Sequence, residues 1–210
     1  MGYIICDYPD SVPSMLGLSK AVVHVWRVSL DRKVEERDWH ILELSERQRA
    51  ERFHQKVDRD RFAICRSVLR MILGGYLNRP PERIRFEFGT HGKPFLVGED
   101  IHFNVSHSDG KSLIAVSNSG PVGIDLEPET RALNVEAVQH IVCSESERTR
   151  IFHLPVEARA LALLQVWVGK EAFVKLTGEG LSRPLSQLDV TELPVIFIPA
   201  IPGFVSALAP

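Results

Sequence analysis

The sequence predicts an α+β protein of two similar lobes, residues 1–119 and 120–210, related by pseudo-two-fold symmetry. Each lobe is expected to be a small, mainly antiparallel sheet packed on helices. Hydrophobic residues make up 44% of the 210 residues and charged residues 25%, which is typical of a globular chain with one sizeable core or two small ones. Both halves also show the same order of expected elements, a strand, then helices, then further strands. No residue-level repeat accompanies this order, so the duplication is inferred from the pattern alone.

In the first lobe, strands are expected where apolar and polar residues alternate, and helices where apolar residues recur every three or four positions. Between the first two strands, Ser45 opens an arginine-rich helical region that ends near Gly74 and Gly75. Its apolar stripe consists of Phe62, Cys65, Leu69 and Ile72. The extended segments of this lobe are expected at residues 22–28, 84–88, 101–108 and 113–116.

The second lobe begins with a strand at residues 122–126. Ser144 and Glu147 then have the spacing of a capping box, which marks the start of a helix. A longer apolar helical stretch follows Pro155. The closing strands of this lobe are expected at residues 188–190, 195–198 and 204–208.

Charge and composition exclude several classes of protein. A net charge of −2 and a pI near 6.5 give no overall field that would attract nucleic acid or an anionic membrane, so any anion must be bound by local Arg and Lys clusters. Three scattered cysteines argue against a disulfide framework and favour a reducing compartment. The N-terminus lacks a signal peptide, and no uncharged apolar run approaches ~18 residues. We therefore expect a monomeric cytoplasmic protein that binds neither nucleic acid nor membrane.

The helical stretch at residues 161–175 places charges within a largely apolar helix. Trp167, Glu171 and Lys175 follow one another at i, i+4 spacing and so lie on one stripe. A carboxylate on an apolar face is unfavourable unless it is paired, hydrogen-bonded or bound to a metal. Glu171 is therefore either directed at a polar site or, with Lys170 and Lys175, part of a solvated face with a salt bridge.

Two acidic residues, Asp125 and Glu127, lie two positions apart on the strand at residues 122–126 and just after it. Their side chains should leave the same face, while Ile124 and Leu126 face the core. Two adjacent carboxylates repel unless a cation lies between them, and hard oxygen ligands of this kind suit Mg²⁺. The alternative is a solvent-facing edge strand with two acids that bind nothing. Glu171 is a candidate third carboxylate.

Further candidate groups lie at the end of the segment FNVSHS and in the first lobe. Ser106 and His107 could hold phosphate oxygens, although a histidine in such a loop is more often structural. The arginines between residues 47 and 70 form a solvated helix face, or Arg49 and Arg61 converge on a phosphate. The turn Gly-Lys-Pro offers Lys93, next to Pro94, as another phosphate or ribose contact.

Four motifs occur in the order GKP, FNVSHS, VGIDLE and WVGKEAFVKLTGEGL. Together they resemble the Sfp-type 4′-phosphopantetheinyl transferases, over most of the chain from about residue 44 to residue 185. The resemblance implies two similar α+β lobes with coenzyme A in the cleft between them. It also implies transfer of the phosphopantetheine arm of coenzyme A to a serine of an apo carrier protein of acyl, peptidyl or polyketide type, with release of 3′,5′-ADP.

By motif position, the resemblance also implies roles for individual residues. Asp125, Glu127 and Glu171 would hold Mg²⁺, or Mn²⁺ in its place, on the pyrophosphate. The other contacts to coenzyme A would come from Ser106, His107 and Lys175 at the phosphates, Lys93 and Pro94 at the adenosine end, and Arg49 and Arg61 at the 3′-phosphate. Glu171 is the best candidate for the base that takes the serine proton, directly or through a metal-bound water. Lys170 could stabilise the leaving ADP, although its direction on the helix differs from that of Glu171 by ~100°.

Two alternative functions are weighed against this one. A catalytically inactive coenzyme A or carrier-protein binding module of the same fold would keep the pocket without turnover. Nucleic-acid binding through the arginine-rich helix is disfavoured by the near-neutral charge and the few aromatic residues there. For the transferase, we expect the carrier's serine-bearing helix to dock on residues 113–122 and on the helix before Glu171, unless these segments are simply buried core.

Overall fold

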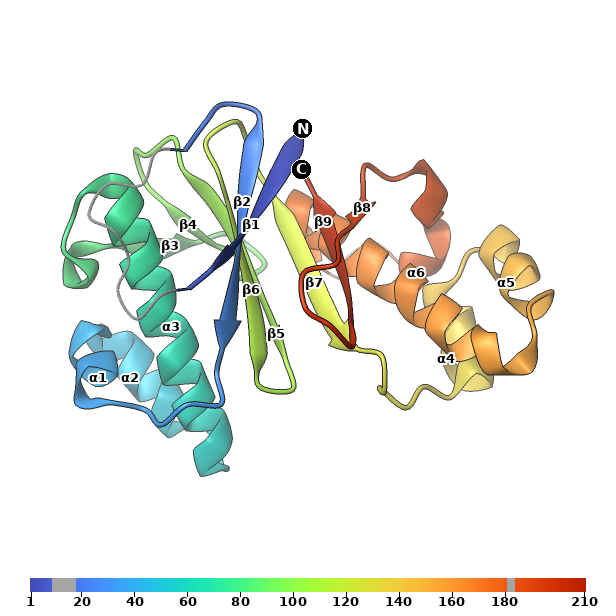
Figure 1. Ribbon diagram of the computed structural model, residues 1–210, viewed down its shortest axis with the longest axis horizontal. Coiled ribbons are helices and arrows are strands. Elements are labelled where there is room, and N and C mark those ends of the chain that lie inside the picture. The colour runs from blue at the N-terminus through green and yellow to red at the C-terminus, as the bar shows by residue number, and fades with distance from the viewer. Residues whose placement is uncertain (9–17, 181–183) are drawn as a thin grey trace.

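A sheet and a 22-residue helix form the main part of each half of the chain. The computed structural model describes residues 1–8, 18–180 and 184–210 and places the first half on the left of Figure 1 and the second on the right. This arrangement confirms the α+β class and the two halves of similar construction.

The first half contains a four-stranded sheet in the order β1-β2-β6-β5, in which β1 and β2 are parallel and the other neighbours antiparallel. Asp109 and Gly110 join β5 to β6 in a two-residue turn and have φ of 44° and 71°, as a type I′ hairpin requires. The sheet strands are β1 (Gly2–Asp7), β2 (Val22–Ser29), β5 (His102–Ser108) and β6 (Lys111–Ser117). A hairpin of β3 (Phe86–Phe88) and β4 (Pro94–Leu96) and the helices α1 (Glu36–Ile41), α2 (Leu44–Glu51) and α3 (Lys56–Leu77) complete this half.

The second half contains an antiparallel sheet in the order β7-β9-β8. Its strands and helices are β7 (Gly123–Pro128), β8 (Ile196–Phe197), β9 (Phe204–Ala209), α4 (Val135–Val142), α5 (Glu145–Phe152) and α6 (Val156–Thr177). The capping box of Ser144 and Glu147 at the start of α5 is confirmed. Among the described helices, none combines the length and the apolar character that a membrane span requires.

The strand predicted at residues 188–190 is wrong, because this stretch links two 3₁₀-helices, Leu185–Gln187 and Val190–Glu192, and its last residue begins the second of them. The Asp189 side chain accepts a hydrogen bond from the Thr191 N–H and so starts the second of them. Such local side-chain-to-backbone bonds compete with strand pairing. The strands predicted at residues 195–198 and 204–208 are confirmed as β8 and β9, whereas β1, β4, α1 and α4 were not predicted.

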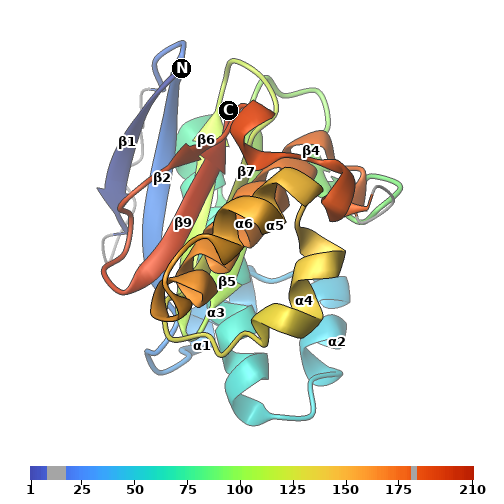
Figure 2. The same cartoon turned by 90° about the vertical axis from the view of Figure 1, so that its right-hand side faces the viewer.

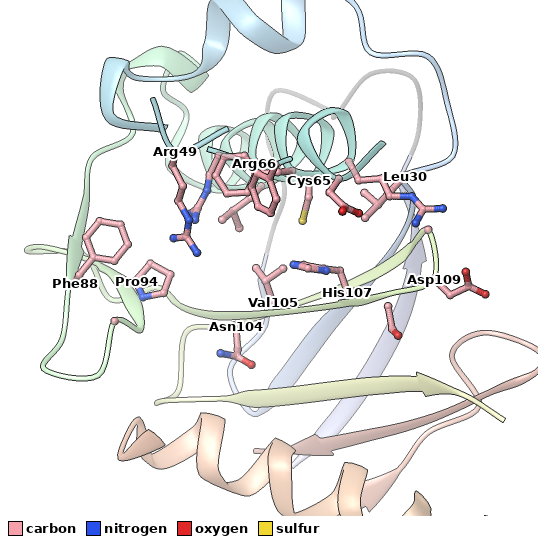
Figure 3. A pocket seen from close by; sticks show the side chains of 18 residues that line it. Leu30, Arg49, Cys65, Arg66, Phe88, Pro94, Asn104, Val105, His107 and Asp109 are labelled. Carbon is pink, nitrogen blue, oxygen red and sulfur yellow. The ribbon is translucent and has the colours of Figure 1, made fainter. Parts of the chain in front are cut away.

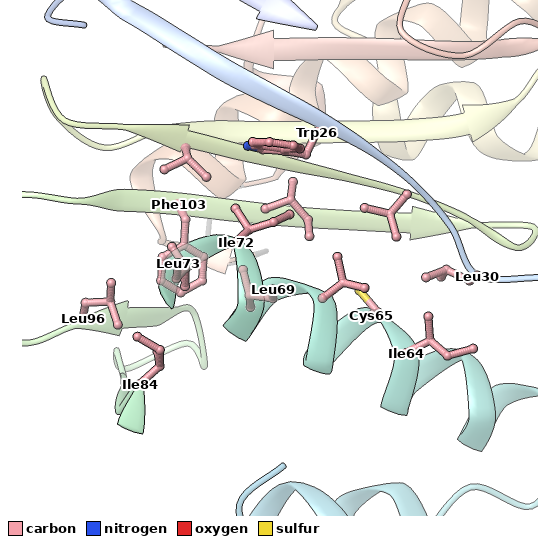
Figure 4. Packing of buried hydrophobic residues seen from close by; sticks show 14 residues of the cluster. Trp26, Leu30, Ile64, Cys65, Leu69, Ile72, Leu73, Ile84, Leu96 and Phe103 are labelled. Atoms are coloured by element: carbon pink, nitrogen blue, oxygen red, sulfur yellow. The ribbon is translucent and has the colours of Figure 1, made fainter. Parts of the chain in front are cut away.

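The two sheets pack on each other, with one long helix on each outer side (Figures 1 and 2). Helix α3 packs on the first sheet through a cluster that includes Trp26, Ile72 and Phe103 (Figure 4). The other face of that sheet packs on β7 and β9, and Ile124 and Leu126 lie fully buried in this second cluster, as predicted. Helix α6 covers the outer face of the second sheet. The order of layers is therefore α3, first sheet, second sheet, α6.

Strands β5 and β7 lie side by side where the two sheets meet, and side chains rather than a backbone ladder join them. The Ile124 N–H donates to Asn104 Oδ1 at 2.9 Å. Further along, Ser106 faces Asp125 and Ser108 faces Glu127. The residue numbers rise together on both strands, so β7 runs parallel to β5. This seam brings the FNVSHS and VGIDLE motifs into contact.

Each long helix carries one fully buried cation at the same distance from its first residue, Arg70 in α3 and Lys170 in α6. Arg70 donates to Glu46 Oε2 at 2.8 Å, and Lys170 donates to Glu147 Oε2 at 2.5 Å. Both glutamates are the third residue of the preceding helix and belong to the capping box that opens it. Both cations also donate to backbone carbonyls of the segment that follows their helix. The two halves therefore share a residue-level device that the sequence alone did not reveal.

Candidate active site

Strands β5 and β7 bring two serine hydroxyls onto two carboxylates. Ser106 Oγ donates to Asp125 Oδ1 at 2.7 Å, and Ser108 Oγ donates to Glu127 Oε2 at 2.6 Å. Asp125 and Glu127 leave the same face of β7, as predicted. Their register partners on β9, Ala207 and Val205, pack against α6, so this face of the sheet is the one that is turned to the helix. The two acids therefore point from the strand toward the catalytic candidates on α6.

Helix α6 contributes the cation that pairs with this strand. The Lys175 ammonium donates to Asp125 Oδ1 at 2.6 Å and to Ser106 Oγ at 3.0 Å. Asp125 is only 5% exposed, and burial raises its pKa above the usual value although the charge and hydrogen bond of Lys175 oppose that shift. Lys175 thus pairs with Asp125 on β7 rather than with Glu171 on its own helix.

Glu171 lies in the same pocket, one turn before Lys175. Burial raises the pKa of its carboxyl group, and the negative charge of Asp125 raises it further, followed by a smaller contribution from Glu127. A cavity of about 360 Å³ adjoins these three acids. We call it the carboxylate pocket, and its lining consists of Val105, Ser106, His107, Asp125, Glu127, Trp167, Glu171 and Lys175. The interpretation of Glu171 as directed at a polar site is confirmed over that of a solvated helix face.

The cations now present hold the carboxylates that could bind a metal. Among the described residues, no three His, Cys, Asp or Glu side chains lie close enough to hold an ion together. Lys175 pairs with Asp125, and Arg131 pairs with Glu127 through a short contact. Three carboxylates and two cations leave the pocket with excess negative charge, which suits a divalent ion with hard oxygen ligands.

Arg131 was not predicted from the sequence. Its guanidinium contacts Glu127 and lies over the Trp167 ring at 5.0 Å, so it joins two residues that line the carboxylate pocket. It follows Glu127 by four positions, a spacing that suggests a contact only within a helix, and this stretch is not helical. No sequence signal could therefore have indicated the contact.

A second, larger cavity of about 550 Å³ lies between α3 and β5 (Figure 3). We call it the arginine pocket, because Arg49, Arg61 and Arg66 line it together with Phe53, Phe62, Phe88, Pro94 and His107. Arg61 pairs with Asp31 at 2.7 Å, and Arg49 lies over the Phe62 ring at 5.4 Å. Arg49 and Arg61 thus line the same cavity.

Arg66 is the strongest addition to the predicted residues of this pocket. Its side chain is 12% exposed, and its Nη1 atom has no hydrogen-bond partner within the described parts of the chain. Burial lowers the pKa of this guanidinium. A buried donor without a partner is unfavourable unless a ligand supplies an acceptor. The sequence placed Arg66 only within a solvated arginine-rich face.

His107 joins the two cavities, since it lines both. Figure 3 shows its ring in the arginine pocket. Burial lowers the pKa of its imidazole, and the positive charges of Lys175 and then Arg49 lower it further. The ring is thus surrounded by cations from both pockets, which is the environment of a group that accepts or contacts an anion.

Two predicted positions differ from expectation. The prediction that Lys170 lies near the leaving group is wrong, because its ammonium is fully buried away from the pocket and bonds to Glu147 and to the carbonyls of Val142 and Leu185. Residues 113–116 are buried in β6 inside the first sheet, so they cannot receive a partner, and the alternative of buried core is confirmed for them.

Lys93 and Pro94 lie at the turn between β3 and β4. Pro94 lines the arginine pocket, as a contact for a nucleotide requires. The Lys93 ammonium instead donates to three backbone carbonyls and points away from that pocket toward the end of α6.

Comparisons with known proteins agree with these features. Residues 121–200 match a family described as the 4′-phosphopantetheinyl transferase superfamily, and residues 29–119 match one described as 4′-phosphopantetheinyl transferase, N-terminal. The 4′-phosphopantetheinyl transferase HetI of Nostoc sp. is 33% identical over 188 residues, which cover 87% of this chain and 79% of HetI. The 4′-phosphopantetheinyl transferase Sfp of Bacillus subtilis is 29% identical over 162 residues, 77% of this chain and 71% of Sfp.

Proposed function

Because the chain belongs to the 4′-phosphopantetheinyl transferase superfamily and transfers phosphopantetheine to carrier proteins, we propose that its two adjoining pockets divide the binding of coenzyme A between them. The arginine pocket takes the adenosine 3′-phosphate end, and the carboxylate pocket takes the pyrophosphate. The observation that carries this proposal is the position of His107, which lines both pockets and so marks their junction.

The arginine pocket has the groups that a phosphorylated nucleoside needs. Arg61 and Arg49 provide planar guanidinium groups for the 3′-phosphate, and the unpaired Nη1 of Arg66 adds a third donor. Phe62 and Pro94 provide apolar surface for the adenosine. Asp31 accepts from Nε and Nη2 of Arg61, the latter at 2.7 Å, so the phosphate competes with this carboxylate for the guanidinium.

In the carboxylate pocket, Asp125, Glu127 and Glu171 would hold Mg²⁺, or Mn²⁺ in its place. Their oxygen ligands fit such an ion, and the excess of three carboxylates over two cations supports its binding. When bound, the ion supplies charge neutralisation at the pyrophosphate. Lys175, released from Asp125, and Ser106 and His107 then contact the phosphate oxygens.

Transfer forms one phosphorus–oxygen bond and breaks another. The serine oxygen of the carrier attacks the phosphorus that bears the pantetheine arm, the bond to the other phosphate breaks, and 3′,5′-ADP leaves. Glu171 takes the hydroxyl proton, directly or through a water molecule. Its place in the pocket beside Asp125 and Lys175 supports this role, because a base has to lie within reach of the proton that it takes. Lys175 stabilises negative charge on the oxygens around the reacting phosphorus.

The test is intact-mass analysis of apo carrier proteins of acyl, peptidyl and polyketide type after incubation with coenzyme A, Mg²⁺ and this protein. The carrier that is the natural partner should gain the mass of one phosphopantetheine arm, and a carrier with its serine changed to alanine should not. Asp125→Asn should abolish the gain. Tight coenzyme A binding without a mass change on any carrier would instead support an inactive binding module of the same fold.

Three predictions accompany this proposal. The lobes divide at residues 119 and 120, the chain acts as a monomer, and it resides in the cytoplasm, as the odd number of scattered cysteines favours. The oligomeric state can be checked by light scattering with and without coenzyme A.

A further inference from the structure

The Lys93 ammonium lies where three chain segments meet. It donates to Lys175 O at 2.5 Å, to Leu176 O at 3.1 Å and to Val122 O at 3.1 Å. An ammonium group has three N–H donors, so these three carbonyls use all of them. None is left for a phosphate or a ribose hydroxyl.

The end of α6 needs this partner. The last carbonyls of a helix have no N–H partner further along the helix, and they carry partial negative charge. Val174 O accepts the Gly178 N–H at 3.0 Å, so the ordinary helix cap satisfies that carbonyl. The next two carbonyls, of Lys175 and Leu176, are satisfied by Lys93, which lies more than 80 residues earlier in the chain.

The same ammonium fixes the spacing between the two partners of the central ion pair. On the helix it holds the backbone of Lys175, whose side chain reaches Asp125 Oδ1 at 2.6 Å. Just before β7 it holds Val122 O, three residues before Asp125. Lys93 itself belongs to the turn of the β3-β4 hairpin, whose Phe88 and Pro94 line the arginine pocket.

We propose that Lys93 is a positioning residue for the transferase reaction. It holds the last turn of α6 against β7, so that Lys175 and Glu171 keep their places in the carboxylate pocket. This role replaces the contact to the adenosine end that the resemblance implies for its side chain. It rests on the proposed function, because the reaction that it supports is the phosphopantetheinyl transfer.

Two variants separate a positioning role from a ligand role. Lys93→Met removes the ammonium but keeps most of the apolar stem. Lys93→Arg keeps the charge, but a planar guanidinium cannot direct its donors to three carbonyls that surround one point. Lys20→Met, at an exposed lysine, is the matched control.

For a positioning residue, both Lys93 variants should lower kcat by about 10- to 100-fold, the range for a shift of about 1 Å in catalytic groups, and leave the KM for coenzyme A within about threefold. A KM that rises in Lys93→Met and returns in Lys93→Arg, with kcat unchanged, would overturn the proposal. If Lys93→Met does not fold, Lys93→Arg decides between the same two outcomes.

A double-variant cycle tests whether Lys93 acts through Lys175. In a Lys175→Met background, Lys93→Met should lower kcat by a smaller factor than it does in the unaltered protein, because one of the two groups that it positions is already gone. Losses that multiply in full would contradict the coupling.

Amide hydrogen exchange tests the clamp without any transfer reaction. Peptides that cover the last turn of α6 should exchange several-fold faster in Lys93→Met than in the unaltered protein, and those of α3 should not change. If the unaltered protein transfers no arm, the proposed function fails while this measurement still decides the clamp. Unchanged exchange at the end of α6 would refute the clamp itself.

Discussion

Strand β7 and helix α6 touch backbone to backbone at Gly123, and this contact sets the width of the carboxylate pocket. A Cβ atom at Gly123 would lie 1.9 Å from Ala172 O and 2.4 Å from Leu176 N, whereas real Cβ contacts are essentially never under 3.0 Å. Both contacts are with main-chain atoms, so no rotamer change can relieve them. Gly123→Ala therefore has to push the helix and the strand apart by about 1 Å, which is the difference between the 1.9 Å contact and the 3.0 Å limit.

This displacement predicts losses in stability and in rate. Overpacking of a core contact costs typically ~1–3 kcal/mol in the free energy of unfolding. The Lys175–Asp125 hydrogen bond, 2.6 Å long, would be stretched beyond hydrogen-bonding distance, and Glu171 would move with the helix. A shift of that size should lower kcat by roughly 100-fold.

The assay is the initial rate of phosphopantetheine transfer to a carrier protein, measured with thermal unfolding of the same preparations. Gly2→Ala is the control, because a Cβ atom there meets nothing within 4 Å. A folded Gly123→Ala protein with an unchanged kcat would refute the reasoning that the distance between β7 and α6 determines the geometry of the site.

Three further predictions concern the arginine pocket, His107 and the frame of α6. Arg61→Ala should weaken the binding of coenzyme A by roughly 1.5–3 kcal/mol more than that of 3′-dephospho-coenzyme A, since a charge-assisted hydrogen bond is lost. Equal losses for both ligands in calorimetry would contradict this. Asp31→Asn, which frees Arg61, should increase the preference for coenzyme A over the dephosphorylated ligand. Burial and the charges of Lys175 and Arg49 lower the pKa of His107 from its ordinary value, which favours the neutral ring in the free protein, and a bound phosphate should raise that pKa. Coenzyme A binding at pH 6.5 should thus take up protons, seen as a buffer-dependent binding enthalpy, and His107→Gln should abolish this dependence. Lys170→Met should lower the free energy of unfolding by ~3–5 kcal/mol because it leaves Glu147 buried without its cation. Adding Glu147→Gln to this variant should recover part of the loss. An unchanged unfolding midpoint in Lys170→Met would argue against a structural role for this lysine.

The parts of the site that sequence reasoning placed correctly depend on short-range periodicity. Asp125 and Glu127 had to share a face because side chains alternate on a strand, and Ile124 and Leu126 then had to face the core. The grouping of Glu171 with these acids came from the family resemblance, and the shared pocket agrees with it. Local geometry fixes direction along an element, whereas only the packing of elements fixes which directions converge.

The residues that sequence reasoning missed or misplaced depend on that packing. Lys170 and Lys175 lie on the same helix, yet one ends in a buried pair with α5 and the other at Asp125, because the two faces of α6 meet different neighbours. Arg66 and Arg131 lie in no recognisable motif, so only the folded structure shows their contacts at the pockets. The arginine-rich face of α3 was expected to be solvated, and β5 together with the β3-β4 hairpin covers part of it.

The two long helices show why the same frame carries a reaction in only one of its halves. Each is anchored by its buried cation to the preceding helix and to the segment that follows, which fixes its rotation. One position beyond the cation lies Met71 in α3 and Glu171 in α6, and five positions beyond it lie Gly75 and Lys175. Met71 packs on the apolar core of the first half, whereas Glu171 and Lys175 line the carboxylate pocket. Because packing already fixes the direction of these positions, a change of two side chains on one helix is enough to place a carboxylate and a cation at a pocket whose opposite wall is supplied by the other half.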